Sequence, residues 1–216
     1  MIEIYLFVNP LGGVCLEIEK NILHLVETEN KKIQFRFIPL LNMKTINTLL
    51  KLNNIPIHDI ERRNQLFEDI YSASLDYKAA QLQGKKKGRR LLIGLQKAVA
   101  CEGRRYSPQL AEDLLIEAGG DIDMYRTDRK SAFVKESFQT DQQIAREMGI
   151  EKHPTAVVYN YACERDFGVL VEDCDSMEEI KRLCQTSEET LYQFKHPLEL
   201  NGRQEQHVLR GHLHLL

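Results

Sequence analysis

The sequence predicts an α/β fold whose sheet is interrupted by a large all-helical insertion. A strand–helix–strand pattern opens the chain, a block of amphipathic helices without a strand follows, and strands return in the last third. We therefore expect a discontinuous sheet domain at residues 1–42 and 136–190, a helical insertion at residues 43–135, and a tail at residues 191–216 that stays unassigned. A chain of 216 residues buries enough surface to fold without disulfide or metal staples.

The opening segment predicts a central strand followed by a helix and a second strand. The first strand is apolar on both faces, with Ile2, Ile4, Leu6 and Val8 on one and Tyr5 and Phe7 on the other. Such a strand is typical of a covered position in a sheet. After a break at residues 9–13, a helical stripe follows, formed by Cys15, Ile18, Ile22 and Leu25. Residues 33–38 form the next strand, which we expect to lie parallel to the first.

The middle of the chain predicts four or five helices. Apolar residues recur at intervals of three and four over residues 66–80 and again over residues 91–99. Ser107 followed by Pro108 predicts the start of another helix, because the first is a good cap and the second fits the first helical position. Asp121 is expected to cap one more helix.

The last third predicts a helix and a strand. A capping box at Thr140 and Gln143 indicates the start of a short helix, which Gly149 would end. A strand is expected over residues 150–159, with Pro154 near its start, where proline is tolerated.

A hairpin partner for that strand is expected at residues 167–171, and Ser176 with Glu179 predicts a final helix. The whole order of elements is a thioredoxin-like pattern with a helical insertion.

Composition excludes several classes of protein. Hydrophobic residues make up 43% and charged residues 28%, as in an ordinary globular protein. The net charge is −3, so the overall charge does not indicate a nucleic-acid partner. No stretch approaches the ~20 apolar residues of a membrane span, and the first residues do not resemble a signal peptide. The five cysteines are an odd number without a Cys-x-x-Cys pair, which favours a reducing cytoplasm.

Three segments resemble DsbA-like proteins of the thioredoxin superfamily. Phe7-Val-Asn-Pro-Leu-Gly-Gly-Val-Cys15 resembles the turn into the active helix, and residues 140–155 resemble the helix and cis-proline strand. Residues 71–88 are similar to the first long insertion helix of one branch, the SpxH (YjbH-type) adaptors. The resemblance implies a DsbA-like fold and an adaptor that delivers the regulator Spx to the ClpXP protease.

The chain departs from the DsbA-like pattern at the redox motif. Gly12, Gly13, Val14 and Cys15 occupy the four positions of a Cys-x-x-Cys motif, so the first, nucleophilic cysteine is replaced by glycine. Cys15 shares the apolar stripe of its helix, which favours an inert, buried thiol, because burial shields a thiol and raises its pKa. The alternative is a monothiol nucleophile that uses glutathione. We expect no dithiol oxidoreductase activity.

Two segments are candidates for binding a protein. The resemblance implies a cis-proline turn at His153, Pro154 and Thr155, which either shapes the strand start or pairs with an extended peptide. Lys85, Lys86 and Lys87 begin a dense basic run, which is either a solvated helix face or a dock for an acidic protein surface. A nucleic-acid patch is disfavoured because no aromatic residue is interleaved before Tyr106.

Metal and cofactor chemistry is not indicated by the sequence. His196, His207, His212 and His214 lie in the tail, and the last two could share a metal, but no second ligand cluster accompanies them. Cys163, Cys174 and Cys184 are most simply small core residues. We expect neither a metal site nor a cofactor.

These observations lead to one functional hypothesis and one alternative. The hypothesis is a cytoplasmic, redox-inactive adaptor that binds an Spx-like client and contacts ClpXP, with no nucleic acid or membrane as partner. The alternative is a cytosolic thiol or glutathione-dependent oxidoreductase or transferase on the same scaffold. Glycine at position 12 counts against the alternative, because those enzymes place a serine or cysteine near that position.

Overall fold

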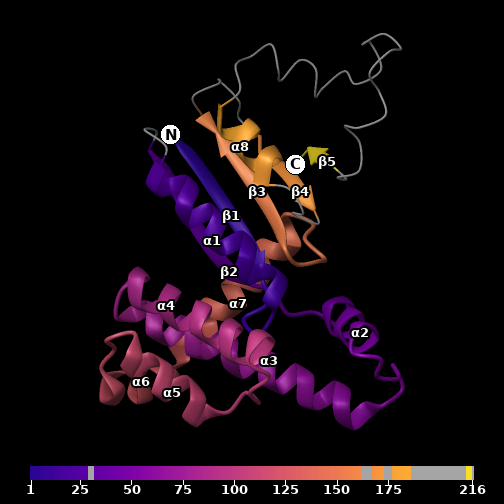
Figure 1. Cartoon of the computed structure of the whole chain (residues 1–216), viewed down its shortest axis with the longest axis vertical. Helices are drawn as coiled ribbons and strands as arrows, with labels where there is room; N and C mark the ends of the chain where they lie inside the picture. The colour runs from indigo at the N-terminus through magenta and orange to yellow at the C-terminus, as the bar shows by residue number, and fades with distance from the viewer. Residues whose placement is uncertain (29–31, 162–166, 173–176, 186–212, 216) are drawn as a thin grey trace. The chain divides into compact units, whose positions relative to one another are not determined.

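The computed structural model describes residues 1–28, 32–161, 167–172, 177–185 and 213–215 (Figure 1). The elements in chain order are β1 (Ile2–Val8), α1 (Gly13–Thr28), β2 (Ile33–Pro39), α2 (Met43–Leu52), α3 (Ile60–Leu82), α4 (Lys85–Gln96), the π-helix η1 (Lys97–Cys101), α5 (Pro108–Glu117), α6 (Ile122–Lys130), α7 (Ala132–Glu147), β3 (Thr155–Asn160), β4 (Val169–Glu172), α8 (Met177–Gln185) and β5 (Leu213–Leu215). Among the described residues, no helix combines the length and apolarity needed to cross a membrane.

The chain divides into two compact units. The strand unit comprises residues 1–6, 18–37 and 154–216, and the helical unit comprises residues 7–17 and 38–153. The domain bounds expected from the sequence, at residues 42 and 136, differ from this division and stay a prediction. Residue 136 lies inside α7, so a boundary there would cut a helix.

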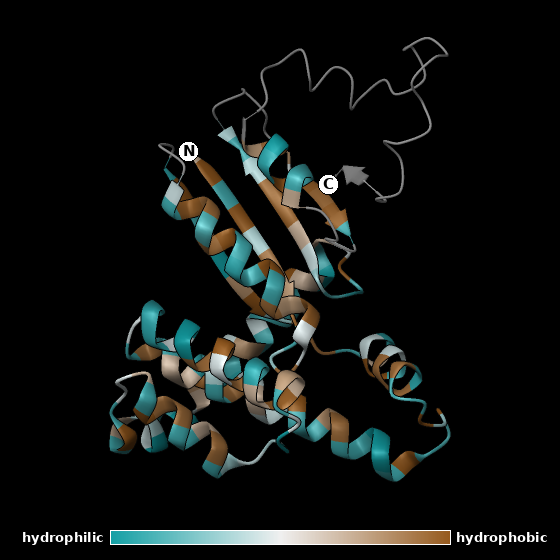
Figure 2. Cartoon of the chain, in the orientation of Figure 1, coloured by the Kyte–Doolittle hydropathy of each residue, from teal (hydrophilic) through white to brown (hydrophobic). Residues whose placement is uncertain are grey.

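The strand unit is built on a five-stranded sheet in the order β2-β1-β3-β4-β5. β1 lies inside the sheet, as its two apolar faces predict, and Ile2, Ile4 and Leu6 are buried. β3 and β4 form the predicted antiparallel hairpin, with Val158 opposite Val169. The stripe of α1 is also buried, and α1 alternates polar and apolar residues along its length (Figure 2).

The helix α8 confirms the predicted final helix over its described residues. Ile180 and Leu183 are buried, and the side-chain amide of Asn160 in β3 donates to the Leu183 carbonyl over 3.0 Å. The predicted cap Ser176 lies outside the described residues, as do Cys163, Cys174 and the tail histidines His196, His207 and His212. His214 lies in β5, and its side chain is also outside the description.

The helical unit is organised around α3. This helix packs against α2, α4, α5, α6 and α7, and residues 73–80 are all buried, on every side of the helix. The predicted caps are confirmed: Ser107 accepts from the Leu110 N–H over 3.2 Å, and Asp121 accepts from the N–H groups of the first turn of α6. The predicted helical block is therefore present, without a strand between residues 43 and 135.

The predicted helix start at Thr140 is wrong. α7 begins eight residues earlier, at Ala132, where Ser131 caps it by accepting from the Val134 N–H over 3.3 Å. The Thr140 hydroxyl instead donates to the Glu136 carbonyl over 2.9 Å, in the middle of the helix. A threonine followed by glutamine three residues later also occurs inside helices, where the hydroxyl bonds back to the preceding turn.

The strand predicted over residues 150–159 begins later than expected, at Thr155. Pro154 has no backbone N–H for a strand ladder and directly precedes β3. Upstream, Gly149 ends α7 in the left-handed conformation, as predicted, with φ of 67°.

Candidate functional site

Residues 12–15, which the sequence predicts to be a vestigial redox motif, lie at the start of α1, after a loop that Asn9 holds in place. The Asn9 carbonyl accepts from the Gly12 N–H over 3.0 Å, and its side-chain oxygen accepts from the Leu11 N–H over 3.0 Å. The Gln96 side-chain amide, at the end of α4, also donates to the Asn9 carbonyl over 3.1 Å. Asn9 is buried, so these bonds fix the turn between β1 and α1.

Neighbouring atoms occupy the space that side chains at the two glycines would need. A Cβ built at Gly12 would lie 3.0 Å from the Asn9 Cβ, and one at Gly13 would lie 3.0 Å from the Ala100 Cβ in η1. These distances are tighter than ordinary van der Waals contact, so a side chain at either position requires its neighbour to shift. The loop is therefore packed for glycine at both positions.

Cys15 is placed where the sequence predicted, on the buried side of α1. It is 1% exposed, whereas Val14 beside it is 65% exposed. The Asn9 N–H donates to the Cys15 Sγ over 3.3 Å, and this sulfur lies 3.9 Å from the His153 Nδ1. The helix start therefore presents an inert valine to solvent, and the only sulfur of the motif faces inward.

His153 is brought next to Cys15 but supplies no positive charge to it. Burial lowers the pKa of His153 to about 4, so the imidazole is neutral near pH 7. A reactive thiol is usually exposed and stabilised as the thiolate by a nearby cation. Cys15 lacks the exposure, and its histidine neighbour lacks the charge.

Pro154 and Thr155 are buried at the start of β3, with Thr155 only 1% exposed. They belong to the strand unit, whereas His153 belongs to the helical unit. Peptide contact by residues 153–155 stays a prediction.

The basic run lies at the first turn of α4. Lys85 and Lys86 are exposed and Lys87 is half-buried. The helix cap at Gly84 has no side chain, and no acidic residue lies in the first turn. Lys85 is about 16 Å along α4 from Gln96, the residue that touches the motif loop. The basic run therefore lies at the start of α4, and the loop before residues 12–15 contacts the other end of this helix.

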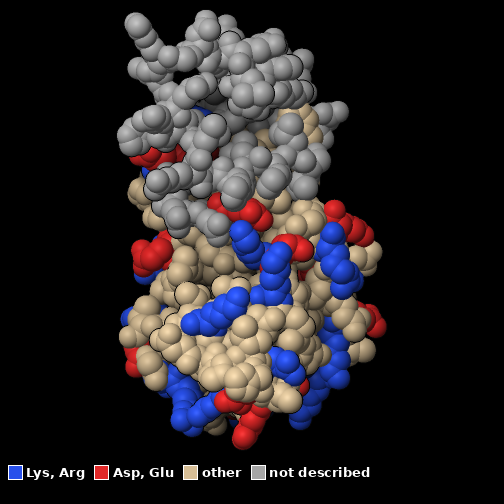
Figure 3. Space-filling view, turned by 90° about the vertical axis from the view of Figure 1, so that its right-hand side faces the viewer, with Lys and Arg blue, Asp and Glu red and all other residues tan. Residues whose placement is uncertain are grey.

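These three lysines oppose the helix dipole. A cation at a helix N-terminus is unfavourable by roughly 0.3–1 kcal/mol, and the exposed position reduces this through screening. These three lysines therefore do not stabilise α4. On the face of the molecule seen in Figure 3, by contrast, basic and acidic side chains are interspersed among neutral ones.

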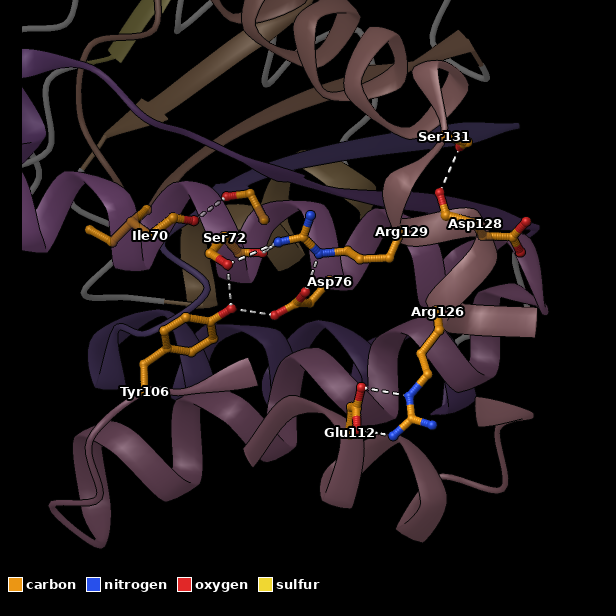
Figure 4. Close-up of polar contacts among 10 residues, drawn as sticks. Ile70, Ser72, Asp76, Tyr106, Glu112, Arg126, Asp128, Arg129 and Ser131 are labelled. Atoms are coloured by element: carbon orange, nitrogen blue, oxygen red, sulfur yellow. Dashed lines mark hydrogen bonds and ion pairs between the residues drawn. The ribbon is translucent and has the colours of Figure 1, made fainter. Parts of the chain in front are cut away.

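The sequence reasoning missed a polar network in the middle of the helical unit. Arg129 of α6 forms an ion pair with Asp76 and donates to the Ser72 Oγ over 2.9 Å. Tyr106, in the segment before α5, donates to Asp76, and its oxygen lies 2.7 Å from the Ser72 Oγ. Figure 4 shows Arg129 and Tyr106 converging on Ser72 and Asp76 of α3.

This network ties α6 and the segment before α5 to the central helix. Burial, together with the neighbouring Asp76 carboxylate, raises the pKa of Tyr106 and of Tyr125, so both phenols stay protonated. Asp76 is a charged residue among the apolar positions of residues 73–80, and this is the signal that could have revealed the network. Lys78 gives the same signal, and its ammonium lies 2.7 Å from Asp141 of α7, with both side chains buried.

Within the described ranges, no group of three or more metal-ligating side chains comes together. Cys101 is exposed and Cys184 is buried. The network around Asp76 and the pair Lys78–Asp141 are buried ion pairs, which fix helix positions.

A thioredoxin family model matches residues 5–182. The chain belongs to the thioredoxin family. Two curated relatives are similar to this thioredoxin-family chain over 74% of its length, and both are called ClpXP adapter protein SpxH. The protein of Staphylococcus saprophyticus is 31% identical over 160 residues, which cover 56% of that relative. The protein of Staphylococcus haemolyticus is 29% identical over 159 residues, which cover 55% of it. The chain spans about half the length of the curated relatives it matches.

Solved structures show the same fold. A putative protein disulfide isomerase from Nitrosomonas europaea matches with a TM-score of 0.63 at 14% identity, over 89% of this chain and 98% of that one. DsbA of Pseudomonas aeruginosa matches with a TM-score of 0.52 at 16% identity, over 73% and 69%. At these identities the likeness shows the fold alone, and it confirms the predicted thioredoxin-like, DsbA-like sheet with a helical insertion.

Proposed function

We propose that this chain is a redox-silent adaptor that binds a client regulator resembling Spx and promotes its degradation by ClpXP. The observation that carries the proposal is the start of α1, where two half-buried glycines and an exposed valine precede the buried Cys15. The similarity to SpxH adapter proteins supports the same function. The reducing cytoplasm is the setting we propose, since the client and protease of such an adaptor act there.

An oxidoreductase function is not favoured by the same site. Thiol–disulfide exchange starts with attack by an exposed thiolate, and a second thiol then resolves the mixed disulfide. At the motif, Cys15 alone carries sulfur, and it is 1% exposed beside a neutral histidine. The chain therefore has a cysteine at the second, resolving position of the motif, but it has no thiol at the first position, where exchange would begin.

The basic run Lys85–Lys87 is the docking surface we propose for the client or the protease. Lys85 and Lys86 are exposed at a helix start, where their charges oppose the dipole, so an acidic partner surface would relieve that repulsion. Charges of this kind mainly accelerate encounter and make it sensitive to salt. Residues 153–155 are a second proposed contact, which would act through the backbone because Pro154 and Thr155 are buried.

The adaptor function is tested by reconstituted degradation. Purified ClpXP and an Spx-like regulator are mixed with and without this chain, and the half-life of the regulator is measured. We expect the chain to shorten the half-life at least tenfold and to copurify with the regulator. Degradation at the same rate with and without the chain would refute the adaptor function.

The docking surface is tested by reversing its charge. The triple variant Lys85→Glu, Lys86→Glu and Lys87→Glu should bind its partner at least tenfold more weakly at low salt, with a flatter salt dependence. Its unfolding free energy should not fall, because the acids suit the helix start.

The matched control is the triple variant Lys51→Glu, Arg62→Glu and Arg63→Glu, which changes the net charge equally at another helix pair of the same unit. An equal loss of affinity in both triple variants would show an effect of net charge instead of a docking surface. Unchanged affinity at low salt in the first variant would also refute the docking role.

A further inference from the structure

The side of α4 that faces away from the core carries three cations and one apolar side chain. Lys86, Arg90, Ile93 and Lys97 follow one another at intervals of four, three and four, so they share one face of the helix. The three cationic residues are exposed, and Ile93 is half-buried. These four residues are termed the α4 stripe, and all of them belong to the helical unit.

The opposite side of α4 is fixed in the core of the helical unit. Leu91, Leu92 and Leu95 are buried there. A Cβ built at Gly88 would lie 2.6 Å from the Gln81 Cγ, so α4 approaches α3 closely at this glycine. Glycine weakens a helix interior, and its position here serves that close approach. These contacts hold α4 in place and leave the stripe as its outward side.

The stripe carries more positive charge than the neighbouring chain balances. α4 contains no acidic residue, and residues 84–105 hold eight Lys or Arg against one acid, Glu102. The Lys97 Nζ lies 3.8 Å from a carboxylate oxygen of Glu102, but the lysine side chain is 67% exposed, so solvent weakens this pair. Lys86 and Arg90 lie one helical turn apart and repel each other. A partner with carboxylates would remove this repulsion.

The spacing of the stripe fits a second helix. Its members follow one another at about 6, 4.5 and 6 Å along the axis, and the stripe is about 16 Å long. A strand repeats on one face only every ~6.6 Å, so it falls out of register with the stripe at Ile93. A helix with acids at the same intervals places a carboxylate opposite each cation and an apolar side chain opposite Ile93. Because the intervals four, three and four read the same in both directions, either orientation of that helix fits.

We propose that the α4 stripe binds an acidic amphipathic helix of a protein partner. The partner helix presents three carboxylates spaced like the three cations, and an apolar residue between them packs on Ile93. The inference rests on the proposed adaptor function and narrows its docking surface. Within the basic run Lys85–Lys87, only Lys86 belongs to the stripe, because Lys85 and Lys87 are each turned about 100° away from it around the helix.

The probe for the test is an alanine-based helical peptide that matches the stripe. It has 15 residues, with glutamate at its second, sixth and thirteenth positions and leucine at its ninth. A second peptide of the same composition has its glutamates spread around the helix and controls for charge alone. Each peptide is titrated into the full chain at low salt. The backbone amide shifts of α4 are followed by NMR, which also measures weak affinities.

Two double variants separate the stripe from the rest of the basic run. Lys86→Gln with Arg90→Gln removes two charges from the stripe, and the matched control Lys85→Gln with Lys87→Gln removes two charges beside it. Glutamine is a good helix former, so α4 should form in both variants. The stripe variant is expected to bind the first peptide at least fivefold more weakly than the unaltered chain. The control variant should bind it within twofold of the unaltered chain.

Several results would overturn the proposal. An equal loss in both variants, or equal affinity for both peptides, would show a response to net charge alone. Amide shifts confined to residues outside α4, or no shift at millimolar peptide, would show that the stripe does not bind such a helix. Tighter binding of an oligothymidylate of the same length would assign the stripe to single-stranded nucleic acid. The titration needs neither client nor protease, so its failure leaves the adaptor function to be decided by the degradation experiment.

Discussion

The pairing of Cys15 with a neutral His153 predicts a defined loss of stability in acid. Burial lowers the pKa of His153 to about 4 in the folded chain, against about 6.5 for an exposed histidine. Between these values the unfolded state binds more protons than the folded state. The stabilisation is therefore complete above pH 6.5 and is lost as the pH falls toward 4.

The size of this loss follows from the difference in pKa. A difference of about 2.5 units corresponds to about 3.4 kcal/mol in full, at 1.36 kcal/mol per unit. Between pH 7.5 and pH 5 the unfolded histidine becomes almost fully charged while the folded one stays mostly neutral. The contribution lost over that interval is about 2 kcal/mol.

The measurement is urea unfolding at pH 7.5 and pH 5. The variant His153→Gln should lose about 2 kcal/mol less stability over this interval than the unaltered chain. The control His24→Gln, at an exposed position on α1, should behave like the unaltered chain. The same loss in all three chains would refute a neutral His153, and with it one argument that Cys15 is unreactive.

Two other predictions follow from the packing of the helical unit. Asp141→Ala should cost about 3–5 kcal/mol in urea unfolding, because Lys78 would keep a buried charge without its partner, and adding Lys78→Met should recover most of the loss. A cost below about 1 kcal/mol would contradict the buried pair. Gly12→Cys should form a disulfide with Cys15 on mild oxidation, detected as the loss of two hydrogens by mass spectrometry, after Asn9 shifts to admit the new Cβ. Reduction of insulin by the unaltered chain would contradict the redox-silent motif.

Much of the fold was predictable because its signals are local. The apolar run of β1 and the three-and-four spacing in α1 each identify an element from the residues within it. The caps at Ser107 and Asp121 were equally predictable, because a capping side chain bonds the turn that follows it. The start of α7 was predicted wrongly, since Thr140 and Gln143 match a cap pattern inside a continuous helix.

The candidate site was only partly predictable. The loss of the first cysteine is visible in the sequence, and so is the apolar stripe that buries Cys15. The approach of His153 to this sulfur joins residues 138 positions apart, which no local pattern encodes. The network around Asp76 is likewise non-local, because Arg129 lies on α6 and Tyr106 lies in the segment before α5, both far along the chain from Asp76.

The sequence by itself determined that this chain is an α/β protein with a helical insertion and with glycine, not cysteine, at the first position of the predicted motif. Both conclusions depend on which side chains are present and how they are spaced along the chain. The tertiary structure alone decided that His153 is neutral, that Lys78 finds its counter-charge on α7, and that residues 213–215 complete the sheet. Burial and long-range pairing set these properties, and both arise only when distant segments pack together.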